Sequence, residues 1–279
     1  MDPRFPKTLI TGGNGMVGSY VDFGIKTDRT TLDVTDLKAV LAVAKKIKPK
    51  VILHLAALTN LTDGEKNPLN AYRVNTVGTY NMAVAARTVK AKLVYISTTG
   101  IFDGLKKSPY IESDIPNPQD HYGHSKYAGE LIVQSMLKNY IIARTCWVFG
   151  GGSDVDKKFV ARIISQLKNP ETTEINALND TKGSPTYAKD LVETIKKLIA
   201  KNAKGVFHLT NAGSCSRYDI AKTIVETLKP SVRVTGVKSD YLGPETRRIA
   251  NESSVSRLNP MRPWLEALRE YLLTEWPKF

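Results

Sequence analysis

Short apolar runs alternate with stretches of helical periodicity through the first half of the chain, and this alternation limits the fold more than any other feature. Residues 51–55 and 92–97 are largely apolar, so strands formed there would be buried on both faces. Such strands occur almost only in parallel sheets that helices cover on both sides. The pattern therefore predicts an α/β fold with a doubly wound parallel sheet. The expected strands are residues 7–10, 25–28, 51–55, 92–97 and 140–144, and the expected helices are residues 36–47, 71–89 and 125–137.

The chain changes character after a run of three glycines at residues 150–152. Helical periodicity dominates beyond this point, with one short strand expected at residues 206–209. In doubly wound folds ligands bind outside the carboxyl edge of the sheet, so a smaller lobe is expected to bind a substrate there. We predict a dinucleotide-binding domain over residues 1–148, onto which a segment near residues 183–205 packs back, and a substrate-binding lobe over residues 149–279. The helices expected in the lobe are residues 159–167, 190–200, 218–228 and 264–273.

Composition places the protein among ordinary globular chains. Of its 279 residues, 42% are hydrophobic and 24% are charged, which excludes disorder and coiled coil. No apolar run approaches the roughly 18 residues that a membrane span needs, and the N-terminal residues lack the apolar core of a signal peptide. A cytoplasmic protein with no membrane partner is therefore expected. Cys146 and Cys215 have no cysteine or histidine at metal-ligand spacing, so no metal site is predicted.

The charge balance is basic, with 40 lysines and arginines against 27 acidic residues and a formal net charge of +13. Such a balance favours an anionic partner: nucleic acid, a membrane surface or a phosphorylated small molecule. The basic residues occur in short pairs such as Lys45-Lys46 and Lys106-Lys107 rather than in long runs. Because nucleic-acid binders concentrate their basic residues, this spread favours a small phosphorylated ligand and no nucleic-acid partner.

Three glycines follow the first expected strand. Gly12, Gly15 and Gly18 stand in a T-G-x-x-G-x-x-G frame. Glycine allows a tight turn in which backbone N–H groups and the positive end of a helix approach a pyrophosphate. A glycine-rich turn with no ligand is the alternative, but the position at the first strand of a βαβ unit favours dinucleotide binding. Because no Gly-Lys-Ser/Thr sequence follows, a nucleoside-triphosphate P-loop is not indicated.

The residues that would contact the cofactor's ribose are expected at the end of the second strand, where Asp28-Arg29 lies. An acid there favours an unphosphorylated ribose and an arginine favours a 2′-phosphate, so the pair leaves the choice between NADH and NADPH open. Asp33-Val34, a few residues later, could flank the adenine, and Asp33 could equally be a helix-capping or a solvated acid.

Tyr122 and Lys126 are four residues apart where a helix is expected to begin, which places both on one face. A phenol is a weak acid near neutral pH unless a nearby cation lowers its pKa, and a lysine one turn away can do so. The spacing alone is common in proteins. Together with the glycine turn and with Ser97-Thr98 at the end of an expected strand, it favours a hydride-transfer site.

These motifs resemble the extended short-chain dehydrogenase/reductase family, and the resemblance covers nearly the whole chain. It implies a Rossmann-type doubly wound sheet with a smaller, mainly helical C-terminal substrate lobe, and NADPH as the cofactor with NADH as an alternative. It also implies reduction of the C4 keto group of a nucleotide-linked 4-keto-6-deoxy sugar, with dTDP-4-dehydro-L-rhamnose as the expected substrate and dTDP-L-rhamnose as the product. A homodimer is a further expectation. Besides the glycine turn, the matching segments are residues 32–36, 54–57, 74–79, 94–98, 102–104, 122–126, 144–150, 183–186, 207–211 and 262–268.

The resemblance also implies roles for individual residues. Thr98 would hydrogen-bond the sugar carbonyl, Tyr122 would donate the proton, and Lys126 would tune Tyr122 and hold the ribose. Asn75 would support this network, and Trp147 would flank the sugar, although a large aromatic residue after a strand is often part of a core. The implied cofactor-binding residues are Gly12, Asn14, Gly15, Met16, Val17, Gly18, Asp28, Arg29, Asp33, Val34, Leu55, Ala56, Ala57, Thr59, Asn75, Tyr122 and Lys126, and the implied substrate-binding residues are Thr98, Thr99, Tyr122 and Trp147.

One dipeptide near the expected site departs from the family pattern. Thr99-Gly100 stand where the family commonly has Asp-Tyr facing the substrate, which leaves the identity of the sugar open. Extended dehydratases carry Asp-Glu there as acid and base, so dehydration is disfavoured. Two alternatives stay open: a reductase or epimerase of a different nucleotide sugar, and a noncatalytic cofactor-binding subunit resembling the regulatory subunit of methionine adenosyltransferase. Arg247 or Arg248 could bind a diphosphate or form part of a solvated face.

Overall fold

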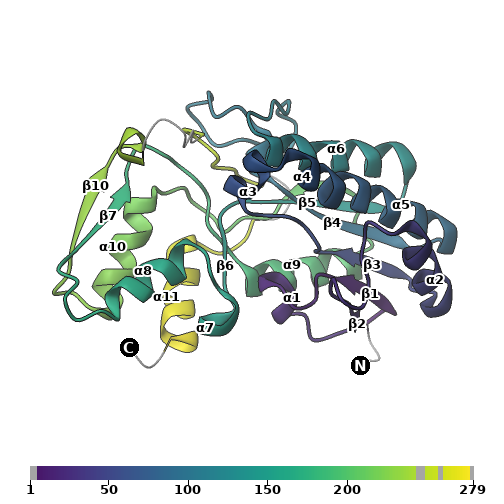
Figure 1. Cartoon of the computed structure of the whole chain (residues 1–279), viewed down its shortest axis with the longest axis horizontal. Helices are drawn as coiled ribbons and strands as arrows, with labels where there is room; N and C mark the ends of the chain where they lie inside the picture. The colour runs from purple at the N-terminus through teal and green to yellow at the C-terminus, as the bar shows by residue number, and fades with distance from the viewer. Residues whose placement is uncertain (1–4, 243–248, 257–259, 277–279) are drawn as a thin grey trace. The chain divides into compact units, whose positions relative to one another are not determined.

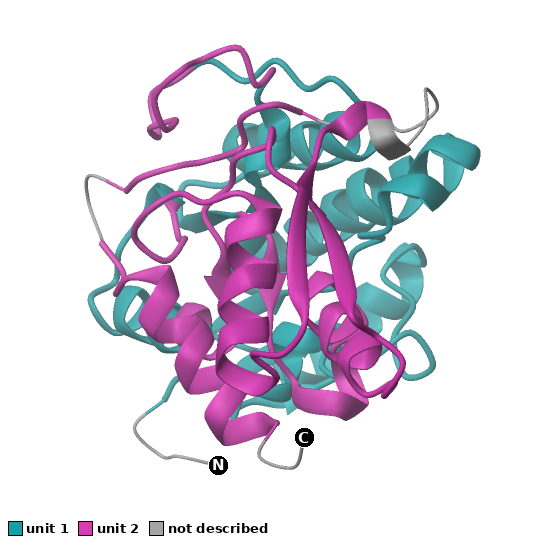
Figure 2. Cartoon of the chain, turned by 90° about the vertical axis from the view of Figure 1, so that its left-hand side faces the viewer, with its two compact units in different colours: residues 1–102, 115–145, 192–207 teal, residues 103–114, 146–191, 208–279 magenta. Residues whose placement is uncertain are grey.

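A computed structural model describes residues 5–242, 249–256 and 260–276. The chain forms two compact units, each made of several chain segments (Figure 2). Unit 1 comprises Met1–Phe102, Ile115–Thr145 and Val192–Phe207, and unit 2 comprises Asp103–Asp114, Cys146–Leu191 and His208–Phe279.

Unit 1 is built on a sheet with the strand order β2-β1-β3-β4-β5-β9 (Figure 1). The pairs from β2 to β5 are all parallel, with Leu9 opposite Ile52 and Ile52 opposite Leu93. The chain runs outward from β1 to β2 and then returns past β1 to β3, so the direction of winding reverses between β1 and β3. The predicted doubly wound parallel sheet is confirmed. The strands are β1 Thr8–Thr11, β2 Ile25–Lys26, β3 Val51–His54, β4 Lys92–Thr98, β5 Tyr140–Thr145 and β9 Gly205–His208.

Helices cover both faces of this sheet (Figure 1). On one face α5 contacts both α2 and α6, and their apolar side chains pack on Leu9, Ile52 and Leu93 to form a buried core. On the other face lies α1, and Lys196 of α9 pairs with Asp22 just after it. The helices are α1 Met16–Ser19, α2 Leu37–Ile47, α3 Leu61–Lys66, α4 Pro68–Tyr72, α5 Gly78–Val89, α6 His121–Met136 and α9 Ala188–Ala200.

The start of α6 differs from the expectation. The helix expected over residues 125–137 begins already at His121. The Asp120 carboxylate accepts the backbone N–H of Gly123 at 2.6 Å and so caps the first turn. Tyr122 therefore lies inside the first turn of the helix rather than in the loop before it.

Two further elements differ from the expectation. The helix expected over residues 71–89 is divided into α4, a π-helical turn at Arg73–Val77, and α5. Single π-helical turns of this kind often occur at functional sites. The strand expected over residues 25–28 is limited to β2, because Asp28 begins a turn in which its carboxylate accepts the backbone N–H groups that follow.

The described part of unit 2 combines helices with two short sheets. In one of them β7 pairs with β10 in parallel, and in the other β6 pairs with β8. The rings of Phe149, Tyr187 and Tyr271 lie with their centroids 5.4 to 5.5 Å apart and join β6, β8 and α11 in an aromatic core. The elements are β6 Val148–Phe149, α7 Gly152–Val155, α8 Phe159–Leu167, β7 Glu174–Leu178, β8 Thr186–Tyr187, α10 Arg217–Leu228, β10 Arg233–Val237 and α11 Trp264–Glu275. Among the residues that the structure describes, no helix has both the length and the apolar character that crossing a membrane requires.

Candidate functional site

The turn after β1 brings backbone close to backbone. Gly12 has φ +69°, and a Cβ there would lie 2.7 Å from the backbone nitrogen of Ala56, which follows β3. A Cβ on Gly18 would lie 2.6 Å from the carbonyl oxygen of Gly12. Both positions therefore require glycine. Since α1 begins at Met16, its first N–H groups, which have no partners within the helix, lie at this turn and can meet a pyrophosphate.

Asp28 holds a turn at the end of β2. Its Oδ1 accepts the backbone N–H groups of Thr30 and Thr31, each at 3.0 Å, and both threonine hydroxyls. Its Oδ2 accepts the side-chain amide of Asn14 at 2.5 Å. The hydrogen bonds from Thr30 and Thr31 lower the pKa of Asp28 to about 2. Asp28 thus ties the glycine turn to the end of β2, while its neighbour Arg29 is exposed.

Asp33 does not cap a helix. It accepts the backbone N–H and the hydroxyl of Thr35, both at 2.8 Å, whereas Asp36 caps α2. The hydrogen bonds from Thr35, together with the positive charges of Arg29 and Arg73, hold the pKa of Asp33 below its usual value. Two arginines therefore lie near the place where an adenosine is expected. Arg73 is not among the predicted residues, because it belongs to the π-helical turn before α5, far along the chain from Asp33.

The carboxyl ends of β1 and β3 are joined by hydrogen bonds. The backbone N–H of Leu55 donates to Thr11 O at 3.1 Å, and that of Ala56 donates to the Thr11 hydroxyl at 3.3 Å. This joins the loop after β3 to the strand that leads into the glycine turn. Ala57 and Thr59, which are also predicted to bind the cofactor, belong to the same loop.

Asn75 connects that loop with α6. Its side chain accepts the backbone N–H of Leu58 at 2.8 Å and donates to Leu58 O at 3.1 Å and to the Ser125 hydroxyl at 2.9 Å. The π-helical turn carries Asn75, which is fully buried. Val34 is held nearby, since its carbonyl accepts the Asn81 amide at 2.9 Å. The Ser125 hydroxyl in turn donates to Tyr122 O at 2.8 Å, so Asn75 is linked to the start of α6 through Ser125. The roles of Asn75 in the catalytic network and in cofactor binding stay predictions.

Thr98 is the last residue of β4, and Tyr122 is the second residue of α6. The backbone segments next to them touch, because a Cβ on Gly123 would collide with Gly100 O. Thr98 Oγ1 accepts the Gly100 N–H at 3.0 Å, which leaves its own hydroxyl proton to be donated elsewhere. Unit 1 thus brings Thr98 and the start of α6 together at the carboxyl edge of the sheet.

Lys126 lies one turn after Tyr122, and only 3% of its surface is exposed. Its Nζ lies 4.2 Å from the centroid of the Tyr95 ring, where the π-electrons attract a cation. Burial lowers the pKa of Lys126 to about 7, and the Glu130 carboxylate opposes this change. Lys126 can therefore hold or release a proton near neutral pH. Thr99 is also buried, and its hydroxyl has no hydrogen-bond partner among the described residues.

Trp147 belongs to unit 2, where it has an unusual backbone and close neighbours. Its φ is +42°, and its indole Nε1 donates a hydrogen bond to the Glu252 carboxylate. The guanidinium carbon of Arg217 lies 3.8 Å from the centroid of the indole ring. Sequence reasoning missed Arg217 and Glu252, because no local spacing connects residues so distant in the chain.

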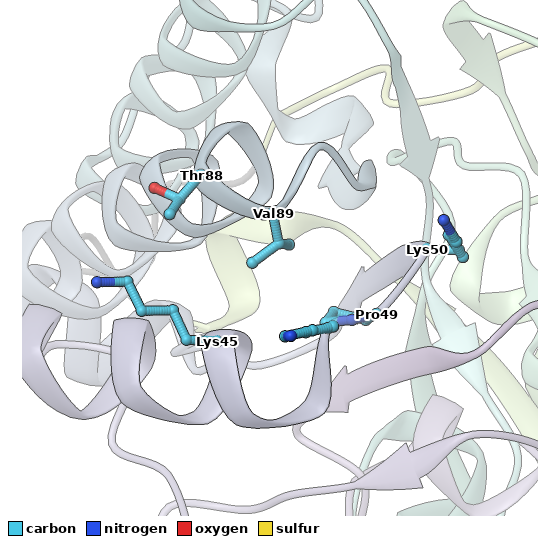
Figure 3. Close-up of a pocket in the computed structure, with 6 residues that line it drawn as sticks. Lys45, Pro49, Lys50, Thr88 and Val89 are labelled. Carbon is cyan, nitrogen blue, oxygen red and sulfur yellow. The ribbon is translucent and has the colours of Figure 1, made fainter.

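A cavity of about 470 Å³ lies at the amino edge of the sheet in unit 1, opposite the carboxyl edge that bears the glycine turn (Figure 3). Because α2 and α5 both end there, the negative ends of two helix dipoles lie at this cavity, and its lysines balance them. None of the residues predicted to bind the cofactor or the substrate lines this cavity. The lining residues are Lys45, Lys48, Pro49, Lys50, Thr88 and Val89.

Two other expectations concern metals and the arginine pair. No group of three or more histidine, cysteine, aspartate or glutamate side chains that could hold a metal occurs within the described ranges. Arg247 and Arg248 lie outside the described residues.

Comparison with known proteins extends over almost the entire chain. Residues 6–274 match the model of the RmlD substrate binding domain family. The dTDP-4-keto-6-deoxy-D-glucose reductase of Streptomyces niveus is 33% identical, covering 94% of this chain and 95% of that protein. The dTDP-4-dehydrorhamnose reductase of Mycolicibacterium smegmatis is 32% identical, covering 97% and 86%. A crystal structure of dTDP-4-dehydrorhamnose reductase from Bacillus anthracis in complex with NADP has a TM-score of 0.91 and 34% identity, covering 96% and 99%. These matches extend over almost the whole chain, including its glycine turn and its parallel sheet. The chain therefore belongs to the RmlD substrate binding domain family of extended short-chain dehydrogenases/reductases.

Proposed function

We propose that this protein uses NADPH to reduce the C4 keto group of dTDP-4-dehydro-L-rhamnose, giving dTDP-L-rhamnose. The observation that carries the proposal is the position of Thr98, Tyr122 and Lys126 at the carboxyl edge of the sheet, the edge that also bears the glycine turn. The reductases named for this sugar that resemble the chain support the same substrate.

The residues present fit a dinucleotide. The glycine turn can receive the pyrophosphate, and Leu55 to Thr59 and Asn75 can line the nicotinamide half. Because Asp28 already serves Asn14 and the turn after β2, we assign the contact with the ribose to its exposed neighbour Arg29. An arginine there favours the 2′-phosphate of NADPH, in keeping with the NADP in the B. anthracis structure. When bound, NADPH supplies the hydride that C4 accepts.

The side chains supply the proton and hold the carbonyl. Tyr122 donates its phenolic proton to the sugar O4, so that the carbonyl becomes an alcohol and no full charge develops on that oxygen. Thr98 donates its hydroxyl proton in a hydrogen bond to the same oxygen and orients it. Lys126, as the ammonium, stabilises the phenolate that Tyr122 becomes, which then recovers a proton from solvent.

A different 4-keto sugar is the second candidate substrate. The S. niveus relative, named for 4-keto-6-deoxy-D-glucose, is about as similar to this chain as the relatives named for rhamnose. Thr99-Gly100 also differ from the usual Asp-Tyr pair. The roles of Thr99 and Trp147 in binding the sugar remain part of the proposal.

The role of unit 2, the oligomeric state and the cellular location are also proposals. We assign substrate binding to unit 2, whose segments make up most of the predicted lobe. A homodimer agrees with exposed apolar side chains on unit 1, namely Leu69, Val77, Tyr80 and Leu131. A cytoplasmic location agrees with NADPH as the cofactor.

The first test is the loss of nicotinamide absorbance when the protein is mixed with NADPH or NADH and freshly generated 4-keto sugar. Both dTDP-4-dehydro-L-rhamnose and dTDP-4-keto-6-deoxy-D-glucose are supplied in separate reactions. We expect turnover of the first sugar, and Tyr122→Phe to lower kcat at least about 100-fold because the proton donor is lost. The neighbouring Tyr127→Phe serves as the matched control and retains activity. Tight NADPH binding with no turnover of either sugar would contradict the proposal and favour a noncatalytic cofactor-binding subunit.

A further inference from the structure

Both faces of the Trp147 indole are covered within unit 2. A Cβ on Gly183 would lie 2.5 Å from both Cδ2 and Cε2 of the indole. These two atoms form the bond that the two indole rings share, so only a group above a ring face can approach both of them so closely. The guanidinium carbon of Arg217, 3.8 Å from the ring centroid, also lies over a face. The Gly183 Cα, which lies one bond from that Cβ position, and the Arg217 guanidinium would overlap if both lay over the same face, so they lie on opposite sides of the indole.

Other contacts fix the same side chain. The Glu252 carboxylate accepts the hydrogen bond from Nε1 and so holds one edge of the indole. The Trp147 backbone is in the left-handed region, which a bulky residue rarely adopts unless its surroundings impose it. Arg217 is itself held from a second side, since its guanidinium lies 4.8 Å from the centroid of the Phe159 ring.

The half-buried indole therefore has only part of its rim left to meet a ligand. A residue that flanks a sugar usually stacks on it with a face, and neither face is available here. If Trp147 flanks the sugar, the packing inside unit 2 therefore leaves the rim of the indole, and not a face, to make the contact.

We propose that Arg217 and Gly183 clamp the Trp147 indole so that it meets the substrate with its rim, and that Arg217 is a positioning residue for the reaction. This inference rests on the proposed function for its substrate, but the clamp itself can be measured without turnover. The planar guanidinium is the part of Arg217 that stacks, so a lysine, which is a compact charge on a flexible stem, would not replace it.

The test uses fluorescence of Trp147 alone. The chain has three tryptophans, so Trp264→Phe and Trp276→Phe together leave Trp147 as the only indole emitter. In that background we expect Arg217→Ala and Arg217→Lys to raise the acrylamide quenching constant at least about twofold, because one face of the indole becomes accessible. Lys222→Ala, which removes an exposed cation from the same helix α10, is the control and leaves quenching unchanged. Thermal melting of each variant shows whether it is folded.

The catalytic readout uses the same substitutions in the otherwise unchanged protein. We expect Arg217→Ala and Arg217→Lys to raise KM for the nucleotide sugar about tenfold while kcat stays within about twofold, because the indole rim is contacted equally before and during the reaction. Unchanged quenching with both folded variants would overturn the clamp. If kcat and the melting temperature of the Arg217 variants both fall while KM stays constant, Arg217 has a structural role and is not a positioning residue. If the parent protein turns over neither sugar, the proposed function fails while quenching still decides the clamp.

Discussion

Lys126 is a cationic side chain placed where charge is costly. Only 3% of its surface is exposed, and the Tyr95 ring provides part of the solvation that water would otherwise give. Burial lowers the pKa of Lys126 to about 7, against the usual value of 10.5. A lysine with this pKa can stabilise a phenolate as the ammonium and exchange protons readily near neutral pH, which is the behaviour the proposed reaction needs.

The same burial predicts a pH-dependent stability. The folded protein binds fewer protons at Lys126 than the unfolded chain between about pH 7 and 10.5, so this group destabilises the fold fully below that window and less as pH rises through it. Lys126→Met should therefore raise the free energy of unfolding of the ligand-free protein, by roughly 5 kcal/mol near pH 6.5 and clearly less near pH 9.5. Urea unfolding at the two pH values measures the difference.

Lys189→Met is the control for this experiment, because Lys189 is half-exposed and paired with Glu270 at 2.8 Å. Its burial is slight, so the pH trend seen with Lys126→Met should be absent. An equal gain for Lys126→Met at both pH values would show that the ammonium is not destabilised in the fold.

At the scale of elements, α6 is joined to β5 by a buried ion pair. Arg144 Nη2 lies 2.7 Å from Glu130 Oε2, and Arg144 Nε lies 3.0 Å from Glu130 Oε1. Glu130 is fully buried and Arg144 is 4% exposed. Since Glu130 follows Lys126 by one turn, the pair fixes the part of α6 that carries the candidate site, and the Glu130 charge opposes the fall in the pKa of Lys126.

Removing one partner of this pair should be far more harmful than removing both. Arg144→Leu leaves the Glu130 carboxylate buried without its cation, and we expect the free energy of unfolding to fall by about 3–5 kcal/mol. Combining Arg144→Leu with Glu130→Leu should recover most of that loss. Urea unfolding of the two single variants and the double variant measures the coupling, and additive losses would mean that the two charges do not act as a pair.

At the scale of the whole molecule, the net charge of +13 acts on ligands that carry several negative charges. Excess positive charge attracts such ligands, and dissolved salt screens this attraction. We expect the Kd for NADPH to rise about tenfold between roughly 0.05 and 0.5 M NaCl, and the Kd for NADH, which lacks the 2′-phosphate, to rise less. Titration of the nicotinamide fluorescence measures both constants. Equal salt dependence for the two cofactors would argue against a cationic site at the 2′-phosphate, and hence against the role of Arg29.

Local patterns in the sequence determined much of this molecule. Apolar runs alternating with helical periodicity predict the doubly wound sheet, because each pattern depends on the geometry of a few consecutive residues. The glycine spacing predicts the tight turn between β1 and α1, and the four-residue spacing predicts that Tyr122 and Lys126 share one face of α6. These properties are short-range, so they can be derived from the sequence alone.

Tertiary structure decided what depends on distant residues. Asp28 stands where a ribose-binding acid is expected, yet its carboxylate holds Asn14 and the turn that follows β2. Trp147 is bound by Glu252, 105 residues later in the chain, and is covered by Arg217. No spacing within a few residues encodes such neighbours, because they meet only when the elements that carry them pack together. The sequence by itself therefore determined the fold and the type of chemistry, and packing decided which faces of the site residues remain for a ligand.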